Sequence, residues 1–484
     1  MQTHLGTNMR NSSRLRMHGQ LINIMIGLSA GLAGGLARGV VLQRPILTSA
    51  LYGAVFGLLF ALLVARLASS AGTGLIWGLG SAFTIWLLFS SRVMPIFSAV
   101  SHSRAMLDDV RLRFPDLVGD LLCLGTPVGL AVGTFGIRQT NLDRPRFSWG
   151  RAVVAGGLAG IFAGLIFGYW MLVGSFFPLL AGLTQPSGRF AEATAQFAVA
   201  ITIGAAFGVL FQRDVHSYGS CMGWGLGFGI FWWFLGPLTL FAWISRLPLD
   251  WSAQNANDLY GPLIGHILYG LILGVSYATF DRVWLRLFFQ SDPLNRKPEG
   301  PGLHFLRSLQ WGAAAGLAGG LISGPVMFAT GVLTRVAGTD TSLTSVGGLL
   351  THLVISTLIG MSFGLLFRDE SPNIPAGVLW GCLFGMIWWY AGPVTLLPLF
   401  LTGEIDWRAG AISSLLPALI GHLLYGGSTA FFFILLERRY IRRIRLNSRP
   451  ANLDSPPQRP LGNPAPALWM FAIGLGMLLP ILLG

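Results

Sequence analysis

The side chains best suited to chemistry in this sequence are three ionisable groups in apolar surroundings. Asp120, His266 and His422 each follow a glycine, in the related stretches Leu-Val-Gly-Asp, Leu-Ile-Gly-His and Leu-Ile-Gly-His. An ionisable group inside a membrane costs about 2.5–3.5 kcal/mol on insertion scales, so each requires a compensating interaction. A hydrogen bond to a neighbouring carbonyl or hydroxyl group is the first interpretation, and a shared polar cavity or permeation path is the second. Two histidines and one carboxylate also suit Fe(II) or a similar metal, and two histidines suit haem, which is the third interpretation.

Further polar side chains recur at matched positions. Tyr269 and Tyr425 lie three residues after the histidines, on the same helical face. Gln196 and His352 are separated by 156 residues, as the histidines are. The four side chains favour a polar interior between helices.

Two Gly-Pro pairs, Gly236-Pro237 and Gly392-Pro393, interrupt apolar segments. Proline removes a helical donor and clashes with the preceding turn, so each pair is expected to break its helix. Broken helices at corresponding positions of repeated halves are typical of binding sites in transporters. Tryptophans precede both pairs and could form a cage for a cation, but beside glycines at helical spacing we interpret them as packing groups.

These residues belong to two stretches that are nearly the same. Adding 156 to a position in 224–270 gives its counterpart in 380–426, with no gap. Both contain the pattern Trp-x7-Trp-Trp-x2-Gly-Pro-x-Thr-Leu, followed by Gly-His-x2-Tyr-Gly. So many rare residues at one offset indicate an internal repeat. The two patterns resemble a group of uncharacterised prokaryotic multi-pass membrane proteins, and this resemblance implies no particular activity.

Composition identifies the solvent in which these elements fold. The 484 residues are 53% hydrophobic and only 11% charged, and the mean hydropathy is +0.64, whereas soluble domains carry roughly 25% charge. Apolar runs of about 20 residues, long enough to span a bilayer as helices, recur along the chain. The predicted fold class is therefore an all-α polytopic membrane protein. The three cysteines show no metal-type spacing and imply no disulfide framework.

Three groups of glycines, each spaced by four residues, divide the chain into units. Glycine at every fourth position lets another helix approach closely. The glycines are Gly27, Gly31, Gly35 and Gly39, then Gly156, Gly160, Gly164 and Gly168, then Gly312, Gly316, Gly320 and Gly324. We predict three parallel repeats of four helices and one C-terminal helix, about 13 in total. The predicted segments are an N-terminal arm at 1–20, a degenerate first unit at 21–136, a second unit at 151–282, a third unit at 306–436, a Pro-rich linker at 447–466 and a final helix at 467–483.

The net charge of +13 is carried mainly by arginines between the apolar segments. They cluster in the N-terminal arm, between the units and after the twelfth helix, which places these segments in the cytoplasm and the last residue outside. The sequence therefore predicts a cell-membrane (plasma or inner) protein whose arginines face anionic lipid headgroups, and it does not favour nucleic acid as a partner.

Three functions follow from these patterns. Transport or permeation of a small solute or ion is the leading hypothesis, because of the broken helices and the buried polar residues. A non-catalytic membrane scaffold or assembly protein is the alternative, and a metal- or haem-binding redox protein is third. No nucleotide-binding loop, hydrolase elbow or zinc-protease helix occurs in the sequence.

Overall fold

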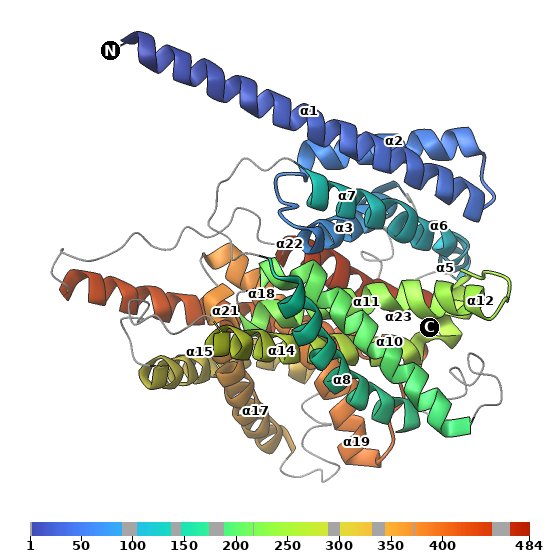
Figure 1. Ribbon diagram of the computed structural model, residues 1–484. Coiled ribbons are helices and arrows are strands. Elements are labelled where there is room, and N and C mark those ends of the chain that lie inside the picture. The colour runs from blue at the N-terminus through green and yellow to red at the C-terminus, as the bar shows by residue number, and fades with distance from the viewer. Residues whose placement is uncertain are drawn as a thin grey trace.

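The protein is an assembly of membrane-length helices (Figure 1). The computed structural model describes residues 2–89, 104–136, 147–173, 188–215, 217–288, 301–331, 344–370, 373–447 and 465–484. Within these ranges, 13 helices are long and apolar enough to cross a membrane. The predicted all-α membrane class and the number of spans are confirmed.

The first unit contains four of these spans. The fourth is assembled from shorter pieces and includes a π-helical turn, η1. The elements are α1 Gln2–Val41, α2 Ile46–Leu63, α3 Ala71–Phe89, α5 Arg104–Arg111, α6 Phe114–Gly119, η1 Asp120–Gly125 and α7 Thr126–Phe135. Helix α1 already begins at Gln2, so the segment predicted as a separate arm continues the first membrane helix.

The second and third units each have the same succession of elements. The second unit contains α8 Trp149–Val173, α10 Gly188–Phe211, α11 Tyr218–Leu235, η3 Gly236–Leu240, α12 Phe241–Ile244, α13 Ala253–Asp258 and α14 Tyr260–Phe288. The third unit contains α15 Pro301–Ala329, α17 Thr344–Phe367, α18 Ile374–Ala391, η6 Gly392–Leu396, α19 Leu397–Thr402, α20 Ala409–Ser413 and α21 Leu416–Asn447. The arrangement of the units as parallel repeats stays a prediction.

Glycines bring helices together backbone to backbone in every unit. The first two membrane helices of each unit pack on one another, as α1 does on α2. A Cβ atom on Gly31 would overlap the carbonyl oxygen of Gly53, and one on Gly156 or Gly312 would overlap a glycine carbonyl in the same way. The spaced glycines therefore serve close packing.

The last helix lies in the middle of the assembly rather than at its edge (Figure 1). It consists of α22 Ala465–Leu468, the π-helical turn η7 Trp469–Ile473 and α23 Gly474–Leu483. Its first part packs against α3, α11 and α18, which are the third helices of the three units. Its last part packs against α5, α13 and α20, the short elements that precede the fourth helices.

Burial of one face of this helix agrees with a central position. Leu475, Leu478, Leu479 and Leu482 share that face and are at most 1% exposed, whereas Met477 and Ile481 on the opposite face are partly exposed. An apolar, buried helix face belongs to the interior of a protein. Hydrocarbon side chains of this helix thus pack against all three of the third helices.

Neighbouring units contact one another at the N-terminal ends of their third helices. The carboxylate of Asp214, at the end of the second helix of the second unit, accepts a hydrogen bond from the Ser70 hydroxyl, beside the N-terminus of α3. A negative charge at this end of a helix is favourable, because the backbone N–H groups point toward it. Next to this contact, Gly72 packs against the ring of Phe211, and Gly219 packs in the same way against Phe367.

Candidate functional site

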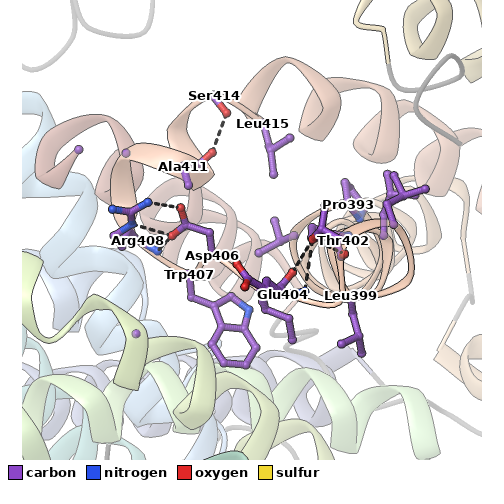
Figure 2. Close-up of a pocket in the computed structure, with 18 of the residues that line it drawn as sticks. Pro393, Leu399, Thr402, Glu404, Asp406, Trp407, Arg408, Ala411, Ser414 and Leu415 are labelled. Atoms are coloured by element: carbon purple, nitrogen blue, oxygen red, sulfur yellow. Dashed lines mark hydrogen bonds and ion pairs between the residues drawn. The ribbon is translucent and has the colours of Figure 1, made fainter. Parts of the chain in front are cut away.

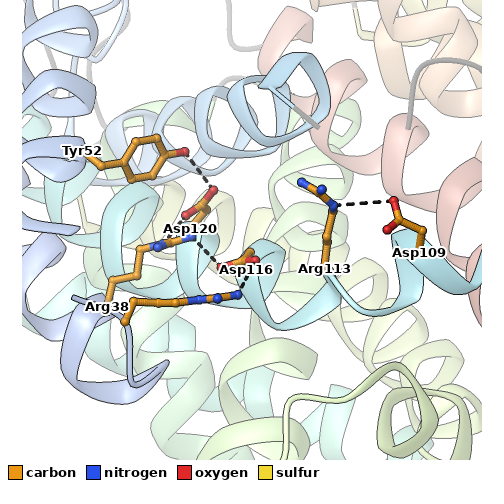
Figure 3. Close-up of polar contacts among 7 residues, drawn as sticks. Arg38, Tyr52, Asp109, Arg113, Asp116 and Asp120 are labelled. Atoms are coloured by element: carbon orange, nitrogen blue, oxygen red, sulfur yellow. Dashed lines mark hydrogen bonds and ion pairs between the residues drawn. The ribbon is translucent and has the colours of Figure 1, made fainter. Parts of the chain in front are cut away.

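Asp120 is held by a charged network inside the first unit (Figure 3). Arg38 donates from Nε to Oδ1 of Asp120 over 2.6 Å, and Tyr52 donates its hydroxyl hydrogen to Oδ2 over 3.0 Å. Arg38 also donates from Nη2 to Asp116 over 2.8 Å, and Arg44 reaches the same carboxylate at 3.3 Å. The buried carboxylate is thereby neutralised by its own unit.

Sequence reasoning found Asp120 but not its partners. Arg38 lies in the apolar segment of the first membrane helix. Placing its charge in the membrane costs as much free energy as placing the charge of Asp120 there. Two opposite charges in neighbouring membrane segments were the signal that could have linked them.

His266 and His422 bind backbone carbonyls of their own helices. Nδ1 of His266 donates to the carbonyl oxygen of Pro262, and Nδ1 of His422 donates to that of Ala418, each over 2.8 Å. The His266 ring also meets Phe167 of α8 edge to face, with centroids 5.3 Å apart. Each histidine therefore has a hydrogen-bond partner within its own unit.

The remaining matched polar residues also bind backbone. Tyr269 donates to the carbonyl of Ala200 over 2.8 Å, and Tyr425 donates to that of Ser356 over 2.6 Å. Gln196 and His352 bind the carbonyl groups of Gly164 and Gly320, at 3.4 Å and 3.1 Å. These hydrogen bonds join a unit's second helix to its first or fourth.

Metal ligation would need several donor side chains to converge. Over the described ranges, no group of three or more His, Cys, Asp or Glu side chains is placed to hold a metal ion. Asp120, His266 and His422 are all in these ranges, and no hydrogen bond joins any two of them. Each of the three residues contacts groups of its own unit.

The Gly-Pro pairs change the helical winding without ending the helix. Gly236 and Pro237 begin the π-helical turn η3, and Gly392 and Pro393 begin η6. Helices α12 and α19 continue directly from these turns, so each chain segment still forms one membrane span. This differs from the expected break: the wider turn accommodates the proline ring and its missing donor while the chain stays helical.

A tryptophan after each π-helical turn is tied back to it. The indole of Trp251 donates to the hydroxyl of Thr239 over 3.0 Å, and that of Trp407 donates to Thr395 over 3.3 Å. Both tryptophans are at most 9% exposed. A hydrogen bond therefore links the loop that carries each tryptophan to the π-helical turn.

A cleft of about 1540 Å³ opens beside η6 (Figure 2). The π-helical turn contributes Pro393 and Val394, and α19 contributes apolar side chains and Thr402. The loop 403–408 forms another wall, and Leu483 shows that the central helix reaches the cleft. The cleft thus joins solvent to the junction of the second unit, the third unit and the central helix.

The charged residues of the cleft are mainly acidic. Asp258, Glu404 and Asp406 line it, against the single arginine Arg408. Arg408 binds Asp406 through two hydrogen bonds of 2.9 Å and 2.6 Å, and this pairing lowers the pKa of Asp406. The carboxylates of Asp258 and Glu404 remain to attract a cation.

Trp407 links the cleft to the second unit as well. Its ring packs on Trp170 of α8, with centroids 5.1 Å apart. Sequence reasoning named Gly392 and Pro393 but missed the cleft, because its walls come from three separate parts of the chain, 257–261, 393–415 and 483–484.

Comparisons of this chain with models of protein families, with curated proteins and with solved structures found no match. The structure therefore identifies this chain as an integral multi-pass membrane protein.

Proposed function

We propose that the protein transports a small solute or ion that is first bound in the cleft beside η6. The observation that carries this proposal is the cleft itself, which connects solvent to a π-helical turn and to the central helix. Ligand sites are usually concave and largely apolar, with a few polar groups, and this cleft has that composition. π-helical turns are also frequent at functional sites.

Coupling between the cleft and the membrane helices supports the same proposal. A solute that displaces the loop 403–408 moves Trp407, and its hydrogen bond to Thr395 transmits the displacement to η6. Gly392 has open space on its side-chain face, with nothing within 4 Å of an added Cβ atom. The turn therefore has room to change its bend.

The proposed architecture places the three units in parallel around α22–α23, with their arginine-rich ends in the cytoplasm. The cleft then opens on the outer side of the cell membrane. Contacts of the central helix with corresponding elements of all three units support this arrangement.

Uptake into proteoliposomes tests the function, with cationic, anionic and neutral solutes offered in parallel. Trp407→Phe keeps an aromatic ring but loses the hydrogen bond to the π-helical turn, and it should slow uptake several-fold. Trp251→Phe is the matched control, because it loses the equivalent bond to Thr239 and does not line the cleft. Equal uptake by both variants and the wild type would contradict the proposed coupling.

A scaffold role is the second candidate, favoured by the filled axis. The apolar α22–α23, whose leucines are buried, places hydrocarbon where an axial pore would run. Absence of uptake for every solute, together with stable binding of another membrane protein, would favour the scaffold over the transporter.

A further inference from the structure

The cleft beside η6 has an apolar wall on the side of α19. This helix contributes Leu397, Leu399 and Leu401 to the lining of the cleft. Leu399 and Leu401 are 41% and 52% exposed, so part of their apolar surface is open to a ligand. Removal of apolar surface from water is favourable, and pockets with such a lining take apolar groups. The cleft is therefore suited to a hydrocarbon chain.

The other face of α19 points away from the cleft. Phe400 lies between Leu399 and Leu401 in the sequence, is 80% exposed and does not line the cleft. Helix α19 belongs to the membrane span Ile374–Thr402, so we expect the Phe400 ring to contact lipid. A helix of six residues thus separates the apolar wall of the cleft from the bilayer.

Exposed carboxylates give the same cleft a net negative charge. Asp258, Glu404 and Asp406 line it against the one guanidinium group of Arg408, and three negative charges and one positive charge leave −2. Arg408 binds Asp406 (Figure 2), so the net charge is carried by Asp258 of the second unit and Glu404 of the third. A concave surface lined by one sign of charge raises the local concentration of ions of the opposite sign.

We propose that the cleft binds an organic cation in which an ammonium group is attached to an apolar chain. The chain packs on the leucines of α19, and the ammonium group lies near the carboxylates of Asp258 and Glu404. The inference deepens the proposed transport function by naming the class of solute, and it rests on that function. An inorganic cation would leave the apolar wall in contact with water, and an uncharged apolar molecule would gain nothing from the carboxylates.

Protection of a cysteine in the cleft tests the class of solute, because it reports binding there and not partition of a probe into lipid. Ser414 lines the cleft and is exposed. Ser414→Cys is made in a protein whose native cysteines are replaced by alanine, and is placed in nanodiscs of phosphatidylcholine, whose zero net charge concentrates neither cations nor anions. The rate of its reaction with N-ethylmaleimide, a neutral reagent, is measured against the concentration of each probe.

Four probes separate the chain from the charge: hexylammonium, butylammonium, hexanol and hexanoate. Hexylammonium should slow the reaction at the lowest concentration. Butylammonium has two CH2 groups fewer and should require a concentration about 15-fold higher, since each buried CH2 group improves affinity about fourfold. Hexanol and hexanoate lack the positive charge and should bind several-fold more weakly than hexylammonium.

Matched variants in the same protein locate the two parts of the solute. Glu404→Gln should weaken hexylammonium binding several-fold and leave hexanol binding unchanged, whereas Asp250→Asn, at an exposed carboxylate that does not line the cleft, should change neither. Leu401→Ala should reduce the difference between the two chain lengths, and Phe400→Ala, on the other face of α19, should preserve it. A thermal unfolding curve for each variant checks that it is folded.

The source of the ammonium group is tested with a second lipid. Phosphatidylethanolamine also carries an ammonium group on apolar chains. If the cleft takes it from the bilayer, nanodiscs that contain this lipid should slow the reaction without any added probe. If the cleft takes the cation from water, only the added alkylammonium ions should do so.

The results separate this inference from the proposed function. Equal protection by hexylammonium, hexanol and hexanoate, or by the two chain lengths, would overturn the class of solute while leaving the cleft as the binding place. Absence of protection by every probe and by phosphatidylethanolamine, in a protein that takes up some other solute, would also overturn the class but not transport. Absence of uptake for every solute would overturn the transport function itself.

Discussion

Two adjacent glycines in α8 provide a sharp test of how the helices are held together. A Cβ atom on Gly156 would overlap the carbonyl oxygen of Gly204 and lie 3.0 Å from Cα of Ala205, in the facing helix α10. A Cβ atom on Gly157 would meet only a methyl group of Ile201, at the ordinary distance of 3.6 Å. The same substitution by alanine is therefore blocked at one position and tolerated at the next.

The two substitutions should change the free energy of unfolding in opposite directions. Gly156→Ala forces two backbones apart, and overpacking of a tight contact costs about 1–3 kcal/mol. Gly157→Ala introduces no clash and gains the helix preference of alanine over glycine, up to about 1 kcal/mol. The difference in free energy of unfolding between the two variants should be about 1–4 kcal/mol.

Unfolding of both variants in mixed micelles with increasing SDS, followed by loss of helical circular dichroism, measures this difference. Gly156→Ala should unfold at a lower SDS fraction than the wild type, and Gly157→Ala at the same or a higher one. Equal midpoints for the two variants would refute the backbone contact between α8 and α10.

Three further predictions concern hydrogen bonding, charge and orientation. Tyr425→Phe removes the 2.6 Å hydrogen bond to Ser356 and should lower the free energy of unfolding by about 1 kcal/mol in the same assay. Arg408→Gln should raise the pKa of Asp406 toward its ordinary value. Because this pKa is lower in the folded than in the unfolded protein, where it is about 4, ionised Asp406 makes a small contribution to stability above that pH. The contribution is lost as the pH falls through the pKa of Asp406 in the folded state. The wild type should therefore lose stability on acidification below about pH 4 more than the variant, as thermal unfolding across pH would measure. A cysteine at position 447, the last residue of α21, should react with a membrane-impermeant thiol reagent only from the cytoplasmic side, and reaction from outside would reverse the predicted topology.

The class of fold could be predicted because the bilayer imposes simple rules. Apolar runs of membrane length and glycines at every fourth position identified the spans and the close-packed faces, for example Gly31 against Gly53. These are properties of single segments, and they are visible in the sequence without knowledge of which segments meet.

The candidate site could be predicted only in part, because its geometry depends on contacts between distant segments. Gly392 and Pro393 marked a special turn, but the choice of a π-helical turn over a break depends on packing around it. The pairing of Asp120 with Arg38 joins residues 82 apart. The central position of α23 was signalled only by its apolar residues on every side.

The central claim is that solute enters through the cleft beside η6, and blocking the cleft tests it most directly. Ser414 is exposed and lines the cleft, whereas Gln254 is exposed and does not. Cys123, Cys221 and Cys382 are first replaced by alanine, and a single cysteine is introduced at either position. Uptake of the cationic, anionic and neutral solutes into proteoliposomes is then measured before and after reaction with a bulky thiol reagent. We predict that modification of Ser414→Cys abolishes uptake and that modification of Gln254→Cys leaves it unchanged. Uptake that continues at full rate with the Ser414→Cys variant completely modified would contradict the claim.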